Sequence, residues 1–159
     1  METFEYEIKS GKRFEFGKNW KSFLATLNDE KIRNVEISLC DMLKIDNLKG
    51  KNFLDIGSGS GIFSLAARRL GGSVHSFDYD TVSVECTKEL RSKYFSNDNN
   101  WIVERGSILD KDYLKSLSKF YVVYAWGVLH HTGNMWKSLE NVVNLVEKNG
   151  FLFIAIYND

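Results

Sequence analysis

The hydrophobic pattern of this chain changes its period near residue 51. Before that point, apolar residues recur at intervals of three and four, which is typical of amphipathic helices. The first stripe consists of Trp20, Phe23, Leu24 and Leu27. The second consists of Ile32, Val35, Leu39, Met42 and Leu43, with Asp29 as the expected N-cap. The sequence therefore predicts two N-terminal helices, ending at Lys49-Gly50-Lys51.

From residue 52 onward, short apolar runs alternate with amphipathic segments. The expected strands are 52–56, 73–77, 101–104, 120–125 and 151–157. The expected helices between them are 62–70, 81–95, 111–117 and 134–147. Such alternation is typical of a parallel sheet covered by helices on both faces. We therefore expect an α/β fold, a Rossmann-like three-layer αβα sandwich, in one domain of residues 1–159: a helical cap (1–50) and a cofactor-binding core (51–159).

Charge and cysteine content exclude several kinds of partner. Twenty-one Lys and Arg balance twenty-one Asp and Glu, so the formal net charge is zero. No nucleic acid or anionic membrane is expected as a partner. The start, METFEYEIKS, has no apolar signal region, and no apolar run reaches the length of a membrane span. Cys40 and Cys86 fit neither a disulfide framework nor metal-ligand spacing, so we expect a cytoplasmic protein without a metal.

A glycine loop, GSGSG, follows the strand expected at 52–56. Gly57 and Gly59 match the first half of the dinucleotide fingerprint G-x-G-x-x-G, but Ile62 stands where the third glycine belongs. A plain flexible turn is the alternative explanation. Asp55, two residues before the loop, argues for a ligand of another kind, because a carboxylate repels a pyrophosphate and attracts an ammonium or a sulfonium.

A second acidic residue lies at the end of the next expected strand. Asp78 follows Gly57 by 21 residues, the offset at which a carboxylate binds ribose hydroxyls. Helix capping is the alternative role for Asp78, although Asp80 is better placed for it. Tyr79 could lie against an adenine face. A ligand with a cationic amino-acid end, a ribose, a flat base and no phosphate fits this pattern. S-adenosylmethionine has these parts, whereas NAD, and with it an oxidoreductase, fits poorly.

With these motifs, residues 50–157 resemble the class I S-adenosylmethionine-dependent methyltransferases, in particular their quinol-methylase-like branch. The matching motifs are LDIGSGSG (54–61), SFDYD (76–80), ERGSILD (104–110) and VVYAWGVLHHTGNMW (122–136). The resemblance implies the cofactor S-adenosyl-L-methionine, with S-adenosyl-L-homocysteine as product. It also implies the residues that bind each part of the cofactor. The methionine end would be held by Asp55, Gly57, Ser58, Gly59 and Gly61, and the ribose by Asp78. The adenine would be bordered by Tyr79, Ser107 and Ile108, and the sulfonium by Trp126. Ser107 departs from the acidic residue of many members, so Asp110 or backbone groups would read the adenine amino group.

Methyl transfer from a sulfonium is an in-line displacement, which needs a base only if the acceptor must lose a proton. His130 and His131 follow the fourth expected strand, on the loop that should face a small-molecule acceptor. Histidine titrates near neutral pH, which makes these two residues the catalytic candidates, with His130 favoured. Loop packing is the alternative role for both, and we expect His75 to be structural.

Three aromatic residues near the N-terminus have two possible roles. Phe16, Trp20 and Phe23 could form a lid over the cofactor or pack a helix onto the core. For Trp126, burial in the core is the alternative to the cofactor site.

The family's usual core has seven strands, and the chain ends after five of them. The last two strands are therefore missing from the expected core, and the strand at 151–157 becomes an exposed edge. A long apolar edge invites pairing with another chain, so either this is a fragment of a longer methyltransferase or it forms a homodimer through that strand. A non-catalytic cofactor-binding module or subunit is the alternative to an active enzyme.

Overall fold

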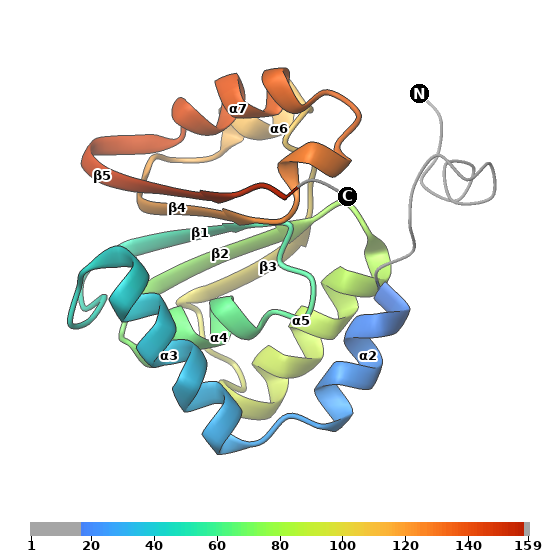
Figure 1. The fold of residues 1–159 in the computed structure, drawn as a ribbon, viewed down its shortest axis with the longest axis vertical. Coiled ribbons are helices and arrows are strands. Elements are labelled where there is room, and N and C mark those ends of the chain that lie inside the picture. The colour runs from blue at the N-terminus through green and yellow to red at the C-terminus, as the bar shows by residue number, and fades with distance from the viewer. Residues whose placement is uncertain (1–16, 158–159) are drawn as a thin grey trace.

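The computed structural model describes residues 17–157, which form a five-stranded, all-parallel sheet between two layers of helices (Figure 1). The strand order is β3-β2-β1-β4-β5. The strands are β1 (Asn52–Ile56), β2 (Ser73–Asp78), β3 (Trp101–Arg105), β4 (Phe120–Trp126) and β5 (Val146–Ala155). The helices are α2 (Gly17–Ala25), α3 (Asp29–Leu43), α4 (Ile62–Arg69), α5 (Thr81–Tyr94), α6 (Lys111–Ser116) and α7 (Met135–Val143), with a 3₁₀ turn at Leu129–His131. The predicted α/β sandwich is confirmed.

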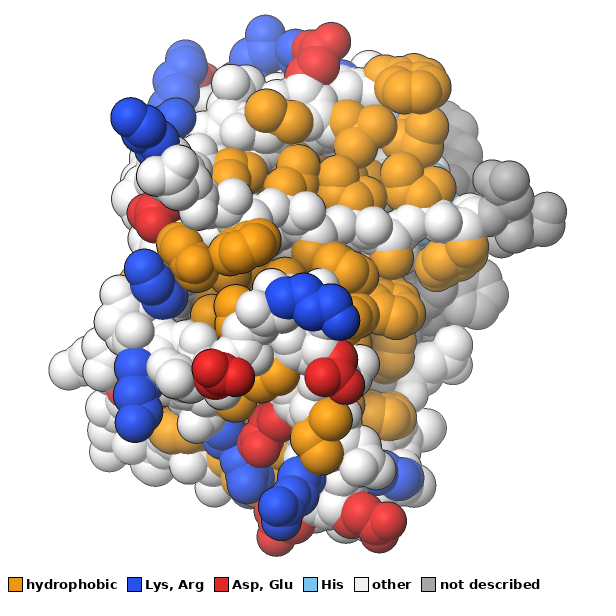
Figure 2. Space-filling model, turned by 60° about the vertical axis from the view of Figure 1, so that its left-hand side comes forward, with side chains coloured by type: hydrophobic (Ala, Val, Ile, Leu, Met, Phe, Trp, Pro, Cys, Tyr) orange, Lys and Arg blue, Asp and Glu red, His pale blue; other side chains and the backbone are white. Residues whose placement is uncertain are grey.

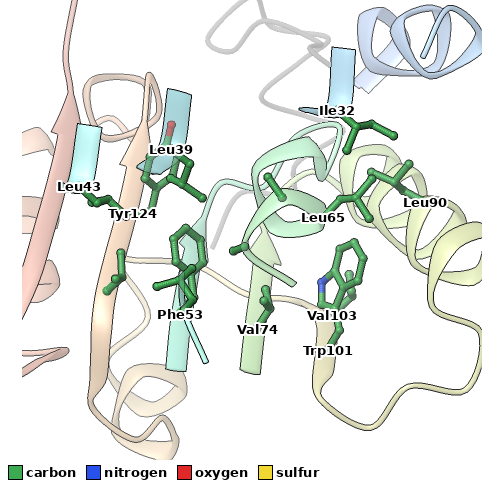
Figure 3. Close-up of a cluster of buried hydrophobic side chains, with 14 of the residues drawn as sticks. Ile32, Leu39, Leu43, Phe53, Leu65, Val74, Leu90, Trp101, Val103 and Tyr124 are labelled. Carbon is green, nitrogen blue, oxygen red and sulfur yellow. The ribbon is translucent and has the colours of Figure 1, made fainter. Parts of the chain in front are cut away.

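Two hydrophobic clusters lie on the two faces of the sheet. On one face, Phe53 and Tyr124 pack with Leu39 of α3 and Leu65 of α4 (Figure 3). On the other face, the cluster around Leu54 includes residues of α7 and is packed against residues of α6. Successive side chains of β1 therefore point to opposite faces, as the pleat requires, and this places Asp55 on the α3–α4 face.

The start of α3 differs from the prediction by one residue. Asn28 is the N-cap, because its side chain accepts a hydrogen bond from the backbone N–H of Lys31 at 2.9 Å. Asp29 is instead the first helical residue, where an acidic side chain also favours the positive end of the helix.

The boundary between the last helix and the last strand was predicted wrongly. α7 ends at Val143 rather than at residue 147, and β5 already begins at Val146. Val143 and Val146 both fall within the helix predicted at 134–147, but Val143 is 58% exposed and Val146 pairs with Phe120 in the sheet. Gly150 lies within the strand, where an added Cβ would be 2.7 Å from the carbonyl oxygen of Tyr121.

β5 lies at an edge of the sheet, as predicted. Phe151 and Leu152 in this strand, and Ile156 and Tyr157 beyond it, are exposed. Figure 2 shows hydrophobic side chains gathered across the middle of one face of the molecule. Pairing of this edge with a second chain stays a prediction. Within residues 17–157, no helix combines the length and the apolar character that crossing a membrane requires.

Candidate active site

A cavity of about 680 Å³ opens at the carboxyl ends of the central strands. Its walls come from segments far apart in the sequence: the glycine loop, the ends of β2 and β4, the turn after β4, and α2 with α3. Ligands of open parallel sheets bind at this edge, next to the strand where the order reverses, which here is β1. The lining residues include Asp55, Gly57, Ser58, Gly59, Asp78, Trp126, His130 and His131.

The backbone conformation of the glycine loop and the side chains packed against it both disfavour any residue larger than glycine. Gly57, Gly59 and Gly61 all have positive φ angles of 71°, 55° and 79°, in the left-handed region that side chains disfavour. An added Cβ would lie 2.4 Å from Val128 at Gly57, and 2.9 Å from Trp20 at Gly59 or from Thr87 at Gly61. Gly57 and Gly59 also line the cavity. Backbone conformation and the close approach of the protein's own side chains already require glycine.

Asp78 holds this loop in place. One of its carboxylate oxygens accepts a hydrogen bond from the backbone N–H of Gly59 at 3.0 Å, and the other accepts from that of Asp80 at 2.9 Å. Burial raises the pKa of Asp78 to about 6, although both N–H groups favour the ionised form. Asp80, not Asp78, caps α5, through a hydrogen bond from the N–H of Val82. Asp78 thus both braces the loop and faces the cavity.

Asp55 is 3% exposed and receives a directed chain of hydrogen bonds. The Ser64 hydroxyl donates to its Oδ2 at 2.5 Å, and the Ser64 and Ser76 oxygens lie 2.6 Å apart. Because the Ser64 proton points to Asp55, Ser76 must donate to Ser64. Ser76 in turn accepts from the Trp101 ring N–H at 2.9 Å. Burial still raises the pKa of Asp55 to about 7, with the Ser64 bond acting in the opposite direction.

Aromatic residues and both histidines line the same cavity as the two carboxylates. Trp126 is 47% exposed and stacks on Phe63 with ring centroids 5.5 Å apart, so the alternative of a core position for Trp126 is excluded. The His130 and His131 rings lie 4.0 Å apart, and Tyr157 meets His130 edge-on at 4.5 Å. Neither ring nitrogen of His130 has a hydrogen-bond partner within residues 17–157.

Several predicted cofactor residues lie outside the cavity lining. These are Gly61, Tyr79, Ser107 and Ile108. Tyr79 stands against Arg105, whose guanidinium lies 5.3 Å from its ring centre, and Ile108 is 4% exposed in the α6–α7 cluster. Asp110, suggested as a substitute reader of adenine, caps α6 by accepting from the N–H groups of Asp112 and Tyr113. The adenine end is thus the part of the expected site with least support in the geometry.

The described N-terminal aromatic residues lie in a helix that packs on the core beside the cavity. α2 packs against α5, and its Trp20 and Phe23 also line the cavity beside the glycine loop. Phe16 lies outside the described residues.

Comparison with known proteins decides the family. A family model described as a methyltransferase domain matches residues 22–159. The chain belongs to this methyltransferase domain family. It is 28% identical to the ubiquinone biosynthesis O-methyltransferase of Pelagibacter ubique over 85% of its own length and 55% of the relative's. It is 33% identical to the ribosomal protein L11 methyltransferase of Prochlorococcus marinus over 73% of its own length and 43% of the relative's. The chain thus spans about half the length of these curated relatives.

Solved methyltransferase structures share the fold. A putative S-adenosyl-L-methionine-dependent methyltransferase from Methanococcus maripaludis matches with a TM-score of 0.71 at 15% identity, covering 89% of this chain and 64% of the other. Coclaurine N-methyltransferase bound to N-methylheliamine and SAH matches with a TM-score of 0.65 at 20% identity, covering 81% of this chain and 37% of the other. This methyltransferase domain thus has the fold of proteins described as using or binding S-adenosyl-L-methionine or its product.

The site of the methyltransferase domain suits that cofactor. Its cavity lies within the usual size range of cofactor pockets, about 300–1,000 Å³. Asp55 and Asp78 present two carboxylates to the cavity from neighbouring strands. The Tyr124 hydroxyl, which also lines the cavity, is buried and has no hydrogen-bond partner among the described residues. A buried hydroxyl without a hydrogen-bond partner at the cavity indicates that a polar ligand group can bind there.

Sequence reasoning missed part of the methyltransferase site. Tyr124 and Tyr157 line the cavity but had been assigned only to apolar strands. For Tyr124 a signal existed, because it pairs in register with Asp55 and shares its face of the sheet. Reading that signal requires the strand register, which the sequence alone does not provide.

Proposed function

We propose that this methyltransferase domain transfers the methyl group of S-adenosyl-L-methionine to a small-molecule acceptor. The observation that carries the proposal is the continuity of one cavity from the glycine loop and Asp78 to Trp126 and the histidines. A donor held at the acidic end would point its sulfur toward an acceptor beside His130.

Each part of the chain has a separate task in this proposal. Asp55 and the backbone of Gly57 to Gly59 hold the amino-acid end, and Asp78 holds the ribose. Trp126 presents an aromatic face to the positively charged sulfur, an interaction of the cation–π kind. The bound cofactor supplies a methyl group already activated by that charge.

His130 is the proposed general base. A lone pair on the acceptor oxygen or nitrogen forms the new bond to the methyl carbon, while the carbon–sulfur electron pair stays with sulfur. The acceptor proton moves to a ring nitrogen of His130, where no described protein group competes for it. His131 packs against His130 and fixes the plane of its ring.

A phenolic or quinol-like acceptor agrees with the aromatic lining of the cavity. Trp126, His130 and Tyr157 belong to this lining. The relatives' names offer two acceptor classes, a ubiquinone precursor and ribosomal protein L11. A pocket lined by aromatic side chains favours the small flat molecule, because planar rings stack in it.

The test begins with calorimetric binding of S-adenosyl-L-homocysteine, followed by a methyl-transfer screen with labelled cofactor. The screen covers simple phenols, catechols and quinols, small amines, and L11 protein. Turnover with a phenolic compound supports the proposal. Turnover with L11 alone would replace the acceptor class, and binding without turnover on any acceptor would make the domain a non-catalytic cofactor-binding module.

A further inference from the structure

The Tyr124 side chain is 1% exposed, yet its hydroxyl has no hydrogen-bond partner among residues 17–157. A buried hydroxyl without a partner is a net cost to the fold, because it has lost its bonds to water. The same side chain lines the cavity. Phenylalanine would fill the same space without this cost, so the hydroxyl of Tyr124 needs an explanation.

The ring of Tyr124 cannot swing away to find a partner. Phe153 stacks on it with centroids 5.1 Å apart and planes 9° from parallel, and Phe63 packs at 4.9 Å. Phe53 of β1 lies on another side at 5.7 Å (Figure 3). Aromatic packing thus fixes the direction in which the hydroxyl points.

Asp55 is the polar neighbour of Tyr124. The two residues are register partners on β1 and β4, so their side chains stand on the same face of the sheet. Burial raises the pKa of Tyr124, and the nearby charge of Asp55 adds to this effect. No hydrogen bond joins them, and the Ser64 hydroxyl donates to Oδ2 of Asp55. A buried donor therefore stands beside a buried acceptor.

An α-amino acid end is the ligand group that satisfies both. Its ammonium can donate to Asp55, and its carboxylate can accept from the Tyr124 hydroxyl. Among the described residues, the cavity lining contains no Lys or Arg to receive that carboxylate. Of the lining hydroxyls, Ser58 pairs with Thr87 and Ser83 donates to Asp80, whereas Ser60 accepts from the backbone N–H of Ile62 and keeps its own proton.

We propose that Tyr124 is a cofactor-binding residue whose hydroxyl donates a hydrogen bond to the carboxylate of S-adenosyl-L-methionine, next to the ammonium held by Asp55. The proposal rests on the binding of this cofactor, but not on methyl transfer or on the identity of the acceptor. It adds a recognition element for the amino-acid end that the motifs do not contain.

The experiment compares two ligands by calorimetry. S-adenosyl-L-homocysteine carries the amino-acid end, whereas 5′-methylthioadenosine has the same nucleoside and thioether without it. In Tyr124→Phe, we expect the dissociation constant for S-adenosyl-L-homocysteine to rise roughly tenfold or more, the typical effect of losing a hydrogen bond to a charged group. The dissociation constant for 5′-methylthioadenosine should stay unchanged.

Two controls accompany this variant. Tyr121→Phe removes the same hydroxyl from the same strand outside the cavity lining, and should leave both affinities unchanged. Thermal unfolding of ligand-free Tyr124→Phe should show an equal or higher midpoint, because the removed hydroxyl made no hydrogen bond with the described chain.

Two results would overturn the proposal: an unchanged affinity of Tyr124→Phe for S-adenosyl-L-homocysteine, or an equal loss for both ligands. If the expected binding pattern appears while no acceptor is methylated, the role of Tyr124 stands and the proposed catalysis fails. If the wild-type chain binds neither ligand, both proposals fall together.

Discussion

The carboxylate of Asp78 accepts a hydrogen bond from the backbone N–H of Gly59 at 3.0 Å. The residue expected to hold the ribose therefore also fixes the loop expected to hold the amino-acid end. Its two oxygens each accept from one backbone N–H, so the carboxylate couples the ends of β1 and β2. Removing it should disturb the loop as well as the ribose contact.

Replacement of Asp78 tests this double role. Asp78→Ala should weaken binding of S-adenosyl-L-homocysteine by about 1–3 kcal/mol, the cost of losing hydrogen bonds to a charged group. Asp78→Asn keeps one acceptor oxygen and should lose less. Calorimetry measures both, with Asp41→Ala on the exposed side of α3 as control. An unchanged dissociation constant for Asp78→Ala would contradict the ribose assignment.

Replacement of Gly61 separates backbone strain from crowding. Gly61→Ala forces a side chain into the left-handed region and against Thr87 at 2.9 Å, which should cost roughly 2 kcal/mol or more in the free energy of unfolding. Gly50→Ala has a similar φ of 70° but nothing within 4 Å, so it should show the strain alone. Urea unfolding compares the two variants, and equal losses would show that the contact with Thr87 contributes nothing.

The core of this fold was predictable because the local sequence identifies its strands. Each of the first four is a short run bounded by glycines or polar turns, and the predicted limits of β1 are those observed. The junction of α7 and β5 was not predictable in this way. Val142, Val143 and Val146 continue a helical spacing, and only pairing of Val146 with Phe120 shows where the sheet begins.

The site was predictable where its residues lie in consecutive motifs and not where they meet across strands. Asp55 and Asp78 follow from their spacing to the glycine loop. The serine chain from Trp101 to Asp55 joins β3, β2 and α4, and no local pattern reveals it. The neighbours of the glycines were also not predictable, because Trp20, Thr87 and Val128 approach them from distant parts of the chain.

The raised pKa of Asp55 predicts a pH-dependent stability. Its pKa is about 7 in the folded protein, against an ordinary value of 3.8. Between these values the folded state keeps a proton that the unfolded state has lost, so stability should fall as pH rises from about 4 to 7 and then level off. Asp55→Asn lacks this group, so urea unfolding at pH 5, 6, 7 and 8 isolates its effect as the difference from wild type. Parallel curves for the two proteins would show that the pKa is not raised.

Ser64 should determine the pH at which the fall in stability ends. Its hydroxyl stabilises the ionised form of Asp55, so Ser64→Ala should raise the pKa of Asp55 further. The stability of this variant should then continue to fall to higher pH than that of wild type. The same urea series measures the shift, and Ser38→Ala, exposed on α3, is the control. A curve that levels off at the wild-type pH would remove Ser64 from the account of Asp55.

His130 should affect turnover without affecting cofactor binding. His130→Gln keeps a polar side chain of similar size but cannot accept the acceptor's proton as a base, so turnover with a hydroxyl acceptor should fall about 10²-fold or more. Binding of S-adenosyl-L-homocysteine should be unchanged. His131→Gln should lose less activity, because His131 acts through the ring of His130. His75→Gln is the matched control, because His75 pairs with Glu104 at 2.8 Å and does not line the cavity. Full turnover in His130→Gln would mean that the acceptor reaches the methyl group already deprotonated, and that this loop only shapes the pocket.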